Sequence, residues 1–363
     1  MTKTPKHRGW YCYLSHICRT LFAATFIVSG FLKAIDPWGT ILSMRNYLVA
    51  YDVTMPEWLV TSFSICLGGF ELLLGCMLLL KLAVRFASVV SMVLMPIFTI
   101  VTLLSATIVP IEDCGCFGEL IKLTPWQSFA KNVVLLFWAI CFWSYHRKDA
   151  FALSKKEAIA ISILAVVTMG LGIYSYRHLP LIDTLPYKKG VNIAEEMSNA
   201  RSEHSTERVV LLYRNNVTNE VHEFSVEDTT WQNDSLWSWV DTRVEKIQKG
   251  AEPTLLEFYV SDSEGDKTAE VLSAPKIYLL FMAQNELCDD VRERFEMVEH
   301  HVEKSNATLA YVSPQDISNI TLAYPILNMD PKTMKTILRA DYGLVVLEKG
   351  VVVDKCNFRD INF

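Results

Sequence analysis

The residues with the clearest chemistry are Cys114 and Cys116, which are separated by a single glycine in the run Glu112-Asp113-Cys114-Gly115-Cys116-Phe117-Gly118. Two thiols at this spacing can form a small disulfide ring, and Gly115 gives the backbone the freedom that such a ring needs. Strained disulfides are the ones that exchange readily with other thiols. The spacing therefore predicts a redox pair, and we assign Cys114 and Cys116 to it.

Two other interpretations of this pair stay open. The first is a permanent disulfide that makes the loop rigid, which the neighbouring acids Glu112 and Asp113 favour because they oppose formation of a reactive thiolate. The second is Cu(I) binding by two thiolates. No histidine or further cysteine lies close in the sequence to complete a zinc site, and we predict no metal.

Lys33 and Glu71 form a second group, because both are ionisable residues inside long apolar stretches. Such residues are costly within a membrane and mark functional sites by default. Glu71 lies near the middle of its stretch and Lys33 near the outer end of its own, so a direct pair requires Lys33 to reach down several ångströms. Structural pairing or a neutral Glu71 is one interpretation, and a proton or quinone site is the other.

Five apolar stretches are long enough to position these residues in a membrane. A bilayer core of about 30 Å needs about 20 mostly apolar residues in a helix. The first stretch follows a basic leader without a signal-peptide cleavage site, so we expect an uncleaved first helix. The five predicted spans are Cys18–Ile35, Leu59–Leu80, Phe86–Val109, Trp126–Tyr145 and Ala158–Tyr176.

Charge divides the chain in two and orients it. Residues 1–180 hold 15 Lys/Arg and 9 Asp/Glu, a net of +6, and residues 181–363 hold 19 and 31, a net of −12. Basic residues gather on the inner side if the N-terminus is cytoplasmic, and the two outer loops are mainly acidic. We expect a multi-pass protein of the bacterial inner membrane with a periplasmic C-terminal domain. A lipid bilayer is the expected partner, and the acidic half argues against nucleic acid.

The second half is expected to be soluble. Glu207–Arg214 and Glu220–Val226 predict a β-hairpin, followed by a Trp-rich segment that covers it. The remaining pattern predicts a βαβ unit, a second helix and a terminal hairpin, which resembles a thioredoxin-like fold. The predicted elements are strands Leu256–Val260, Lys276–Met282 and Thr308–Val312, helices Asp289–Lys304 and Pro331–Ala340, and hairpin strands Leu344–Leu347 and Val351–Lys355.

This thioredoxin-like domain is expected to be degenerate. Where thioredoxins carry Cys-x-x-Cys the chain has one cysteine, Cys288, and where that fold usually has a cis-proline it has Tyr342. Dithiol exchange needs a second thiol nearby, so we interpret the domain as a docking module. For Cys288 and Cys356, a structural disulfide, two free thiols and a redox pair all stay open.

A family resemblance rests on particular segments. Cys114–Gly118, followed by Leu123–Gln127 and a helix, resembles the MauE family of methylamine-utilisation membrane proteins. Ser29–Pro37, with Glu71 and Gly75, resembles the related DoxX-like membrane proteins. With its degenerate thioredoxin-like domain, the chain resembles a type common in the Bacteroidetes. MauE-type bundles are similar in layout to DsbB and vitamin K epoxide reductase, which pass electrons between periplasmic thiols and quinone.

The resemblance implies an all-α membrane bundle, with a four-helix core plus a fifth helix, followed by a soluble α/β thioredoxin-like domain. The expected divisions are 1–150 for the four-helix domain, 151–180 for the fifth helix, 181–252 for a linker and hairpin region, and 253–363 for the thioredoxin-like domain. The resemblance implies that Cys114 and Cys116 are the exchange pair, although the enzymes named above use two outer cysteine pairs.

Two functions follow from these patterns. The first is membrane thiol–disulfide electron transfer through Cys114 and Cys116, with an unidentified periplasmic thiol protein as partner and either a quinone or no cofactor. The second is a non-enzymatic assembly or maturation factor, in which the bundle anchors a module that binds a periplasmic client.

Overall fold

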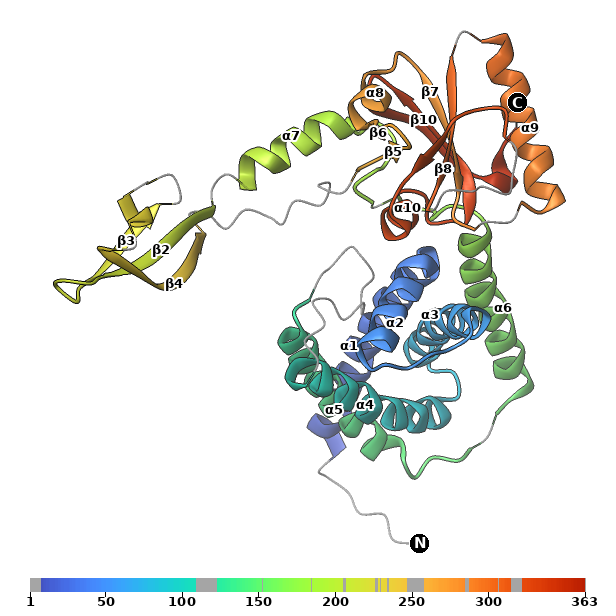
Figure 1. Cartoon of the computed structure of the whole chain (residues 1–363). Coiled ribbons are helices and arrows are strands. Elements are labelled where there is room, and N and C mark those ends of the chain that lie inside the picture. The colour runs from blue at the N-terminus through green and yellow to red at the C-terminus, as the bar shows by residue number, and fades with distance from the viewer. Residues whose placement is uncertain are drawn as a thin grey trace, which may run out of the picture.

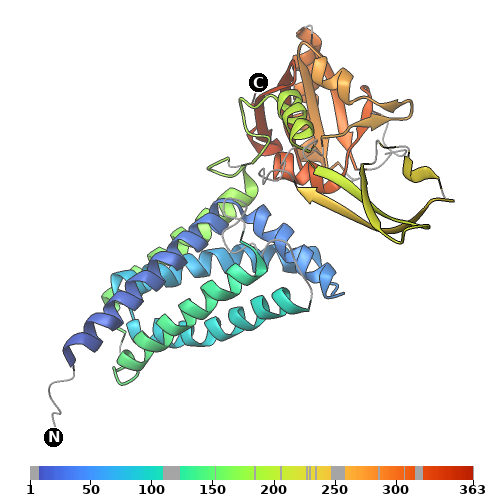
Figure 2. The same ribbon diagram turned by 90° about the vertical axis from the view of Figure 1, so that its left-hand side faces the viewer.

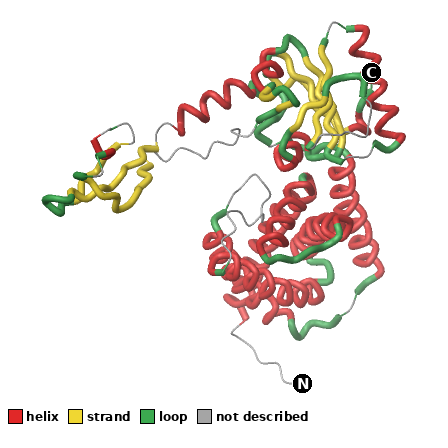
Figure 3. The backbone as a smooth tube through the Cα atoms, viewed as in Figure 1, coloured by secondary structure: helices red, strands yellow, loops and turns green. Residues whose placement is uncertain are grey.

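The structure is a computed structural model of the chain. It describes residues 8–108, 123–151, 153–183, 185–204, 207–225, 228, 230–233, 235–246, 258–284, 287–305, 307–314 and 322–362. Helices make up the first half, and a mixed sheet with helices makes up most of the second half (Figure 3). This arrangement confirms the predicted fold class, a helical membrane bundle followed by a soluble α/β domain.

Five of the described helices are long and apolar enough to cross a membrane, which confirms the predicted multi-pass organisation. They run side by side, and the soluble domain lies at one end of them (Figure 2). We call this the domain end, where α1 and α6 finish, and the other the distal end. The five are α1 (Arg8–Ile35), α3 (Glu57–Leu80), α4 (Val84–Thr107), α5 (Pro125–His146) and α6 (Lys155–Arg177).

Local sequence fixes where two of these helices begin. Before α5, the Thr124 side chain accepts a hydrogen bond from the Gln127 amide, and the Gln127 side chain accepts one from the Thr124 amide. Ser154 and Glu157 form the same reciprocal cap before α6. These capping boxes satisfy backbone donors that the first turn of a helix leaves without partners.

A further helix, α2 (Pro37–Ala50), lies between α1 and α3 in the chain. It was not predicted, because its position between the first two spans indicated an outer loop. The Asp36 side chain caps it by accepting a hydrogen bond from the Gly39 amide at 3.1 Å. Pro37 at its first position suits a helix start. Trp38 and Ile41 are buried against Val60 of α3.

The C-terminal domain is built on a seven-stranded sheet in the order β11-β10-β7-β8-β9-β5-β6. Strands β7 and β8 are parallel and joined by α9 (Asp289–Lys304), and β10 is antiparallel to both β7 and β11. The βαβ unit, the second helix and the terminal hairpin are thus in the predicted order. The strands are β5 (Ser261–Asp262), β6 (Gly265–Asp266), β7 (Ile277–Met282), β8 (Thr308–Ser313), β9 (Ile326–Asn328), β10 (Tyr342–Glu348) and β11 (Val351–Asn357).

Each face of this sheet has its own core, because successive strand residues point to opposite sides. On one face the apolar stripe of α9, including Phe295 and Val298, covers Tyr278 and Leu280. On the other face α10 (Pro331–Leu338) packs with Tyr187, Ile193 and Met197, which come from the segment predicted as a linker region. Helix α7 (Ile193–His204) therefore starts inside the core of the α/β domain. The predicted domain boundaries stay a prediction.

The strand predicted at Leu256–Val260 differs from the structure. Phe258 and Val260 are buried in the core without strand pairing, β5 begins only at Ser261, and residues 256 and 257 lie outside the described residues. An apolar segment can fill a core without joining a ladder, so the pattern alone was misleading. Helix α8 (Thr268–Ser273) and strand β9 were not predicted.

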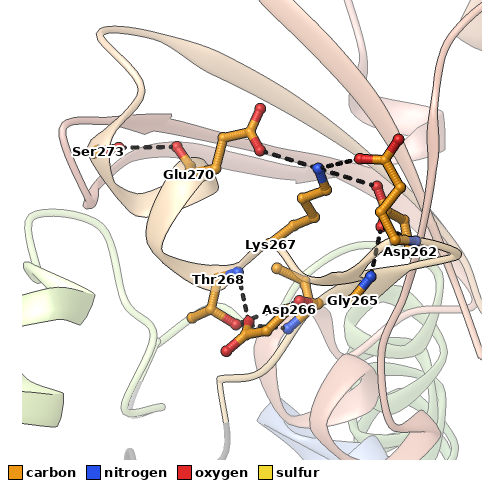
Figure 4. A network of polar contacts seen from close by, with 9 residues as sticks. Asp262, Gly265, Asp266, Lys267, Thr268, Glu270 and Ser273 are labelled. Carbon is orange, nitrogen blue, oxygen red and sulfur yellow. Dashed lines mark hydrogen bonds and ion pairs between the residues drawn. The ribbon is translucent and has the colours of Figure 1, made fainter.

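The turn from β5 to α8 is held by an exposed ionic network (Figure 4). Asp262 accepts hydrogen bonds from the amides of Glu264 and Gly265 at 2.8 and 3.1 Å. The Lys267 ammonium contacts Glu264 at 2.9 Å, Glu270 at 3.5 Å and Asp262 at 3.6 Å. The hydrogen bond that Lys267 donates to Glu264 and the charges of the neighbouring acids raise the pKa of Lys267. The lysine takes the central place among these carboxylates, so the network braces the turn.

A separate three-stranded sheet has the order β3-β2-β4 and contains β2 (Glu207–Asn215), β3 (Val221–Ser225) and β4 (Trp237–Lys246) (Figure 1). It confirms the predicted hairpin and adds a third strand from the Trp-rich segment. Phe224 packs edge-on against Trp237, with ring centroids 4.8 Å apart, and Tyr213 lies 5.4 Å from Trp231. Aromatic packing therefore covers part of one face of this sheet.

Helices α1 and α3 approach closely through small residues, as is common in membrane bundles. A Cβ atom on Gly30 would lie 2.2 Å from the Leu72 backbone nitrogen. A Cβ atom on Gly75 would lie 2.8 Å from the Ile27 backbone nitrogen. These contacts set Gly30 of α1 against Leu72 of α3 and Ile27 of α1 against Gly75 of α3. This alignment of the two helices places Lys33 beside Glu71.

Replacing Gly30 by alanine should therefore separate α1 from α3 and lower the free energy of unfolding by about 1–3 kcal/mol, the usual cost of overpacking. Gly170→Ala in α6 is the matched control, because no atom lies within 4 Å of the Cβ it would add. Thermal unfolding of both variants in detergent checks this. Equal stability of the two variants would contradict the close α1–α3 contact.

Candidate functional site: a polar-ended cavity between the membrane helices

Lys33 and Glu71 form a direct ion pair inside the bundle, which the sequence left open. The Lys33 ammonium lies 2.6 and 2.7 Å from the two carboxylate oxygens of Glu71, and the two side chains are 7% and 4% exposed. Ser29, one turn before Lys33 on α1, donates a hydrogen bond to Glu71 at 2.8 Å. Gly68 lets the lysine stem pass, since a Cβ there would lie 2.9 Å from the Lys33 Cβ.

The pair suits its surroundings because each charge neutralises the other. An isolated charge at membrane depth costs several kcal/mol, whereas a hydrogen-bonded pair recovers much of this cost. Lys33 can donate three hydrogen bonds, and it has three acceptors, the two oxygens of Glu71 and the Ser29 hydroxyl at 3.3 Å. The arrangement therefore fixes both side chains and leaves carboxylate lone pairs that can accept a proton.

The ion pair lines a cavity of about 580 Å³ between helices α1 to α5. This volume lies in the range of roughly 300–1,000 Å³ typical of ligand pockets. Most of its wall is apolar, and the polar groups gather at a few positions. The lining includes Thr25, Phe26, Ser29 and Lys33 from α1, Thr40, Ser43, Met44 and Tyr47 from α2, Val60, Phe63, Leu67 and Glu71 from α3, Met95, Ile97, Phe98, Val101 and Thr102 from α4, and Lys131, Asn132 and Leu135 from α5.

A second polar group lies on the wall formed by α4 and α5. The Asn132 side-chain amide donates to the Phe98 carbonyl and to the Thr102 hydroxyl, both at 3.2 Å. The Thr102 hydroxyl in turn donates to the Phe98 carbonyl at 2.8 Å. These bonds use the amide hydrogens of Asn132, and its carbonyl oxygen is the part of the side chain that can accept a hydrogen bond from a ligand.

The two walls together define the chemistry that the cavity can support. Lys33 holds the Glu71 carboxylate in place through both of its oxygens, and the Asn132 carbonyl oxygen can accept a hydrogen bond from a hydroxyl group. The apolar remainder suits a ring or hydrocarbon body. No group of three or more His, Cys, Asp or Glu residues that could hold a metal occurs in the part of the chain that the structure describes.

Cys114 and Cys116 lie outside the described residues, between α4 and α5 in the sequence. The nearest helix ends on either side are Thr107 of α4 and Pro125 of α5, and both are at the domain end of the bundle. Thr102 is five residues from the end of α4 and Asn132 seven residues from the start of α5, about 8 and 10 Å along the helices. The polar part of the α4–α5 wall is therefore near the helix ends that carry the two cysteines.

The other membrane cysteines do not line this cavity. Cys18 and Cys141 are buried and their side chains are hydrogen-bonded to each other, in the distal half of α1 and α5. Cys66 of α3 is exposed and Cys76 is partly buried. All seven cysteines that the structure describes are free.

Cys288 and Cys356 of the α/β domain are therefore two free thiols in the structure. Cys288 is exposed at the start of α9, and Cys356 lies on β11 opposite Leu344 of β10. Burial, and next the charges of Asp354 and Asp360, raise the pKa of the Cys356 thiol from its ordinary value of 9.0 to about 12. Cys356 is thus a poor nucleophile.

The soluble domain contacts the start of α2, next to the cavity. The Arg339 guanidinium lies 3.5 Å from the Asp36 carboxylate, and both are buried. The Lys335 ammonium lies over the Trp38 ring, 4.1 Å from its centre. Burial lowers the pKa of Lys335, although its ion pair with Asp341 acts in the opposite direction. Trp38 also stacks on Tyr176 of α6, at 5.3 Å between ring centres.

Several residues of this site were missed by the sequence analysis, above all Asn132, Thr102 and the α2 residues. Asn132 carried a usable signal, because an amide inside an apolar membrane helix is as unusual as Glu71. The α2 residues carried none, since their place in the wall depends on how α2 folds back against α3.

Comparisons with known proteins agree with the membrane assignment. The family profile described as Methylamine utilisation protein MauE matches residues 11–145. Protein TlpB from Flavobacterium psychrophilum is 25% identical over 247 residues, which are 67% of this chain and 62% of that protein. The match thus spans less than two thirds of the relative's length. No solved structure matches the chain.

Removing one partner of the ion pair should be more harmful than removing both. Lys33→Met alone leaves Glu71 buried without its cation and should lower the free energy of unfolding by about 3–5 kcal/mol. A double variant, Lys33→Met with Glu71→Leu, should regain most of this stability, because an apolar pair of similar volume is often neutral or better. Unfolding in detergent measures both, and additive losses in the double variant would contradict a direct pair.

The two thiols of the α/β domain should react at very different rates. A pKa near 12 leaves Cys356 with about a thousandfold less thiolate than an ordinary thiol at pH 8. Iodoacetamide labelling of the folded full-length protein, followed by mass spectrometry, should modify Cys288 far faster than Cys356. Denatured protein is the control, in which the two rates should converge; equal rates in the folded protein would contradict the burial of Cys356.

Proposed function

We propose, for a chain whose residues 11–145 form a MauE-like membrane domain, the function of a thiol–disulfide electron-transfer protein of the bacterial inner membrane. In this proposal Cys114 and Cys116 exchange electrons with a periplasmic thiol protein, and a quinone in the cavity is the second redox partner. The observation that carries the proposal is the buried Lys33–Glu71 pair in a largely apolar cavity between the helices that flank the two cysteines.

The orientation of the protein is part of the proposal. The distal end carries basic residues such as Lys81, Arg85, Arg147 and Lys148 beside the helix ends, and the domain end carries the acids Asp52 and Glu57. Positive charge favours the cytoplasmic side. The domain end, the cysteine loop and the α/β domain are then periplasmic, in a compartment where disulfides persist.

The redox step balances between the two thiols and one quinone. Cys114 and Cys116 together give up two electrons and two protons and form one sulfur–sulfur bond. The same two electrons and two protons reduce the two carbonyl groups of a quinone to the hydroxyl groups of a hydroquinone. A reduced periplasmic dithiol then restores Cys114 and Cys116 by exchange and leaves as the disulfide.

Lys33, Glu71 and Asn132 supply the polar contacts for this step. Glu71 can hold a proton close to the ring oxygen, and the Lys33 ammonium keeps the carboxylate in place through both of its oxygens. Asn132 can accept a hydrogen bond from a hydroxyl group at the opposite wall. The apolar cavity walls keep water away from the ring. The volume and the apolar walls of the cavity suit a quinone ring, and Glu71 and Asn132 are the polar groups that would lie beside it.

The α/β domain serves in this proposal as the docking module for the periplasmic partner. It has a thioredoxin-like strand order but one cysteine, Cys288, at the start of α9, and Cys356 is a poor nucleophile. With one accessible cysteine, the domain lacks the thiol pair for exchange, so we assign it partner binding alone.

A single-turnover experiment tests the function without knowledge of the partner. The full-length protein in nanodiscs is reduced with a dithiol, freed of reductant and mixed with menadione. Wild type should reduce the quinone in proportion to the protein present and form the Cys114–Cys116 disulfide, seen by alkylation gel shift. Cys114→Ser and Cys116→Ser should each abolish the reaction, Glu71→Gln should slow it about tenfold or more, and Cys66→Ser is the control that retains it.

A failure of wild type to reduce any quinone, with Cys114 and Cys116 oxidised throughout, would instead favour a permanent disulfide. The assembly-factor function would then be the better one, and the degenerate α/β domain is the feature that favours it. In that case a Cys114→Ala/Cys116→Ala double variant should keep its cellular function as long as it inserts stably.

A further inference from the structure

Five large apolar residues of the cavity wall are also exposed. Two of them, Tyr51 (37% exposed) and Met55 (46% exposed), lie in the segment between α2 and α3, and the other three lie within the membrane helices. Phe63 of α3 is 53% exposed, Ile97 of α4 is 51% exposed, and Val101 of α4 is 40% exposed. A residue can line a cavity and face the surroundings at once only if it borders an opening. We call Phe63, Ile97 and Val101 the α3–α4 mouth.

The packing of α4 explains why an opening lies here. Helix α4 packs along α5 over most of its length and contacts α3 much less, whereas α3 packs against α1 and α6 (Figure 1). Ile97 lies ten residues before the end of α4, about 15 Å from the domain end, and Phe63 lies about 9 Å from the start of α3. At these depths the surroundings are lipid hydrocarbon, so the mouth opens sideways into the bilayer.

The cavity is closed toward the distal end. Phe26, Met95 and Leu135, which line its floor, are at most 4% exposed. At the domain end α2 contributes Thr40, Met44 and Tyr47 to the wall. A molecule dissolved in the membrane therefore has a route to the Lys33–Glu71 pair that does not cross the water phase.

We propose that the ligand of this cavity is a quinone with a long hydrocarbon tail that enters from the bilayer through the α3–α4 mouth. This inference rests on the proposed function and adds the entry route and the tail. The ring lies between Glu71 and Asn132, and the tail passes Phe63, Ile97 and Val101 into the lipid. An uncharged head group suits the polar end, because Glu71 already neutralises the Lys33 ammonium there.

Narrowing the mouth tests the route. Ile97→Trp places a large ring in the opening, and Val93→Trp, one turn away on α4, is the matched control because Val93 is 59% exposed and does not line the cavity. In the single-turnover assay, Ile97→Trp should slow reduction of a polyprenyl naphthoquinone at least tenfold. It should change the rate with menadione, which has the same ring and no long tail, less than twofold. Val93→Trp should change neither rate.

If Ile97→Trp slows the reduction of both quinones equally, or slows neither reduction, the proposed entry route through the α3–α4 mouth is wrong. The proposed function would be unaffected by either result. Photolabelling covers the case in which wild type reduces no quinone. A polyprenyl naphthoquinone with a diazirine on its tail is bound to full-length protein in nanodiscs, and labelled residues are identified by mass spectrometry. Labels on Phe63, Ile97 or Val101 that excess unlabelled quinone removes would support the route. Labels spread equally over lipid-facing positions such as Val166 of α6 would refute it.

Discussion

The arrangement of the membrane helices depends on the buried contact between the Lys33 ammonium and the Glu71 carboxylate. Neither charge is stable alone at that depth, so α1 and α3 must meet in one register that brings the two together. Gly30, Gly68 and Gly75 make this possible, because any side chain at these positions would collide with the facing helix. The polar end of the cavity is a consequence, since the pair lies where α4 stands away from α3.

Helix α2 links this polar end to the soluble domain. It begins four residues after Lys33 and lines the cavity with Thr40 and Met44. Its start is held by contacts with Lys335 and Arg339 of the α/β domain. Lys335 of α10 places its ammonium over the Trp38 ring, and Arg339, directly after α10, places its guanidinium beside the Asp36 carboxylate. Because these cations are buried with their partners, we infer that the α/β domain is held in one position on the bundle. Helix α2 is then fixed by the α/β domain on one side and by α3 on the other.

The sequence was sufficient for features that depend on local pattern. Apolar length predicted five spans within a few residues at most ends. Buried strands and an amphipathic helix at Asp289–Lys304 predicted the βαβ unit and the terminal hairpin. The sequence was not sufficient for features that depend on how the helices pack against one another. Whether Lys33 reaches Glu71 depends on how closely Gly68 lets the two helices approach. The place of α2 depends on the packing of Trp38 and Ile41 against Val60 of α3, which the sequence pattern does not reveal.

The distribution of thiols argues for a division of work between the two halves. In the α/β domain, Cys356 is buried on a sheet strand with its pKa raised, and Cys288 is exposed without a second thiol at the start of α9. A domain with one exposed thiol and one buried thiol of raised pKa lacks the adjacent pair that two-electron dithiol exchange requires. In the proposed function, two-electron chemistry belongs to Cys114 and Cys116. The helix ends that flank them in the sequence, Thr107 and Pro125, are about 10 Å or less along the helices from Thr102 and Asn132. The proposed function thus assigns electron acceptance to the membrane half, which contains the cavity, and partner binding to the α/β half.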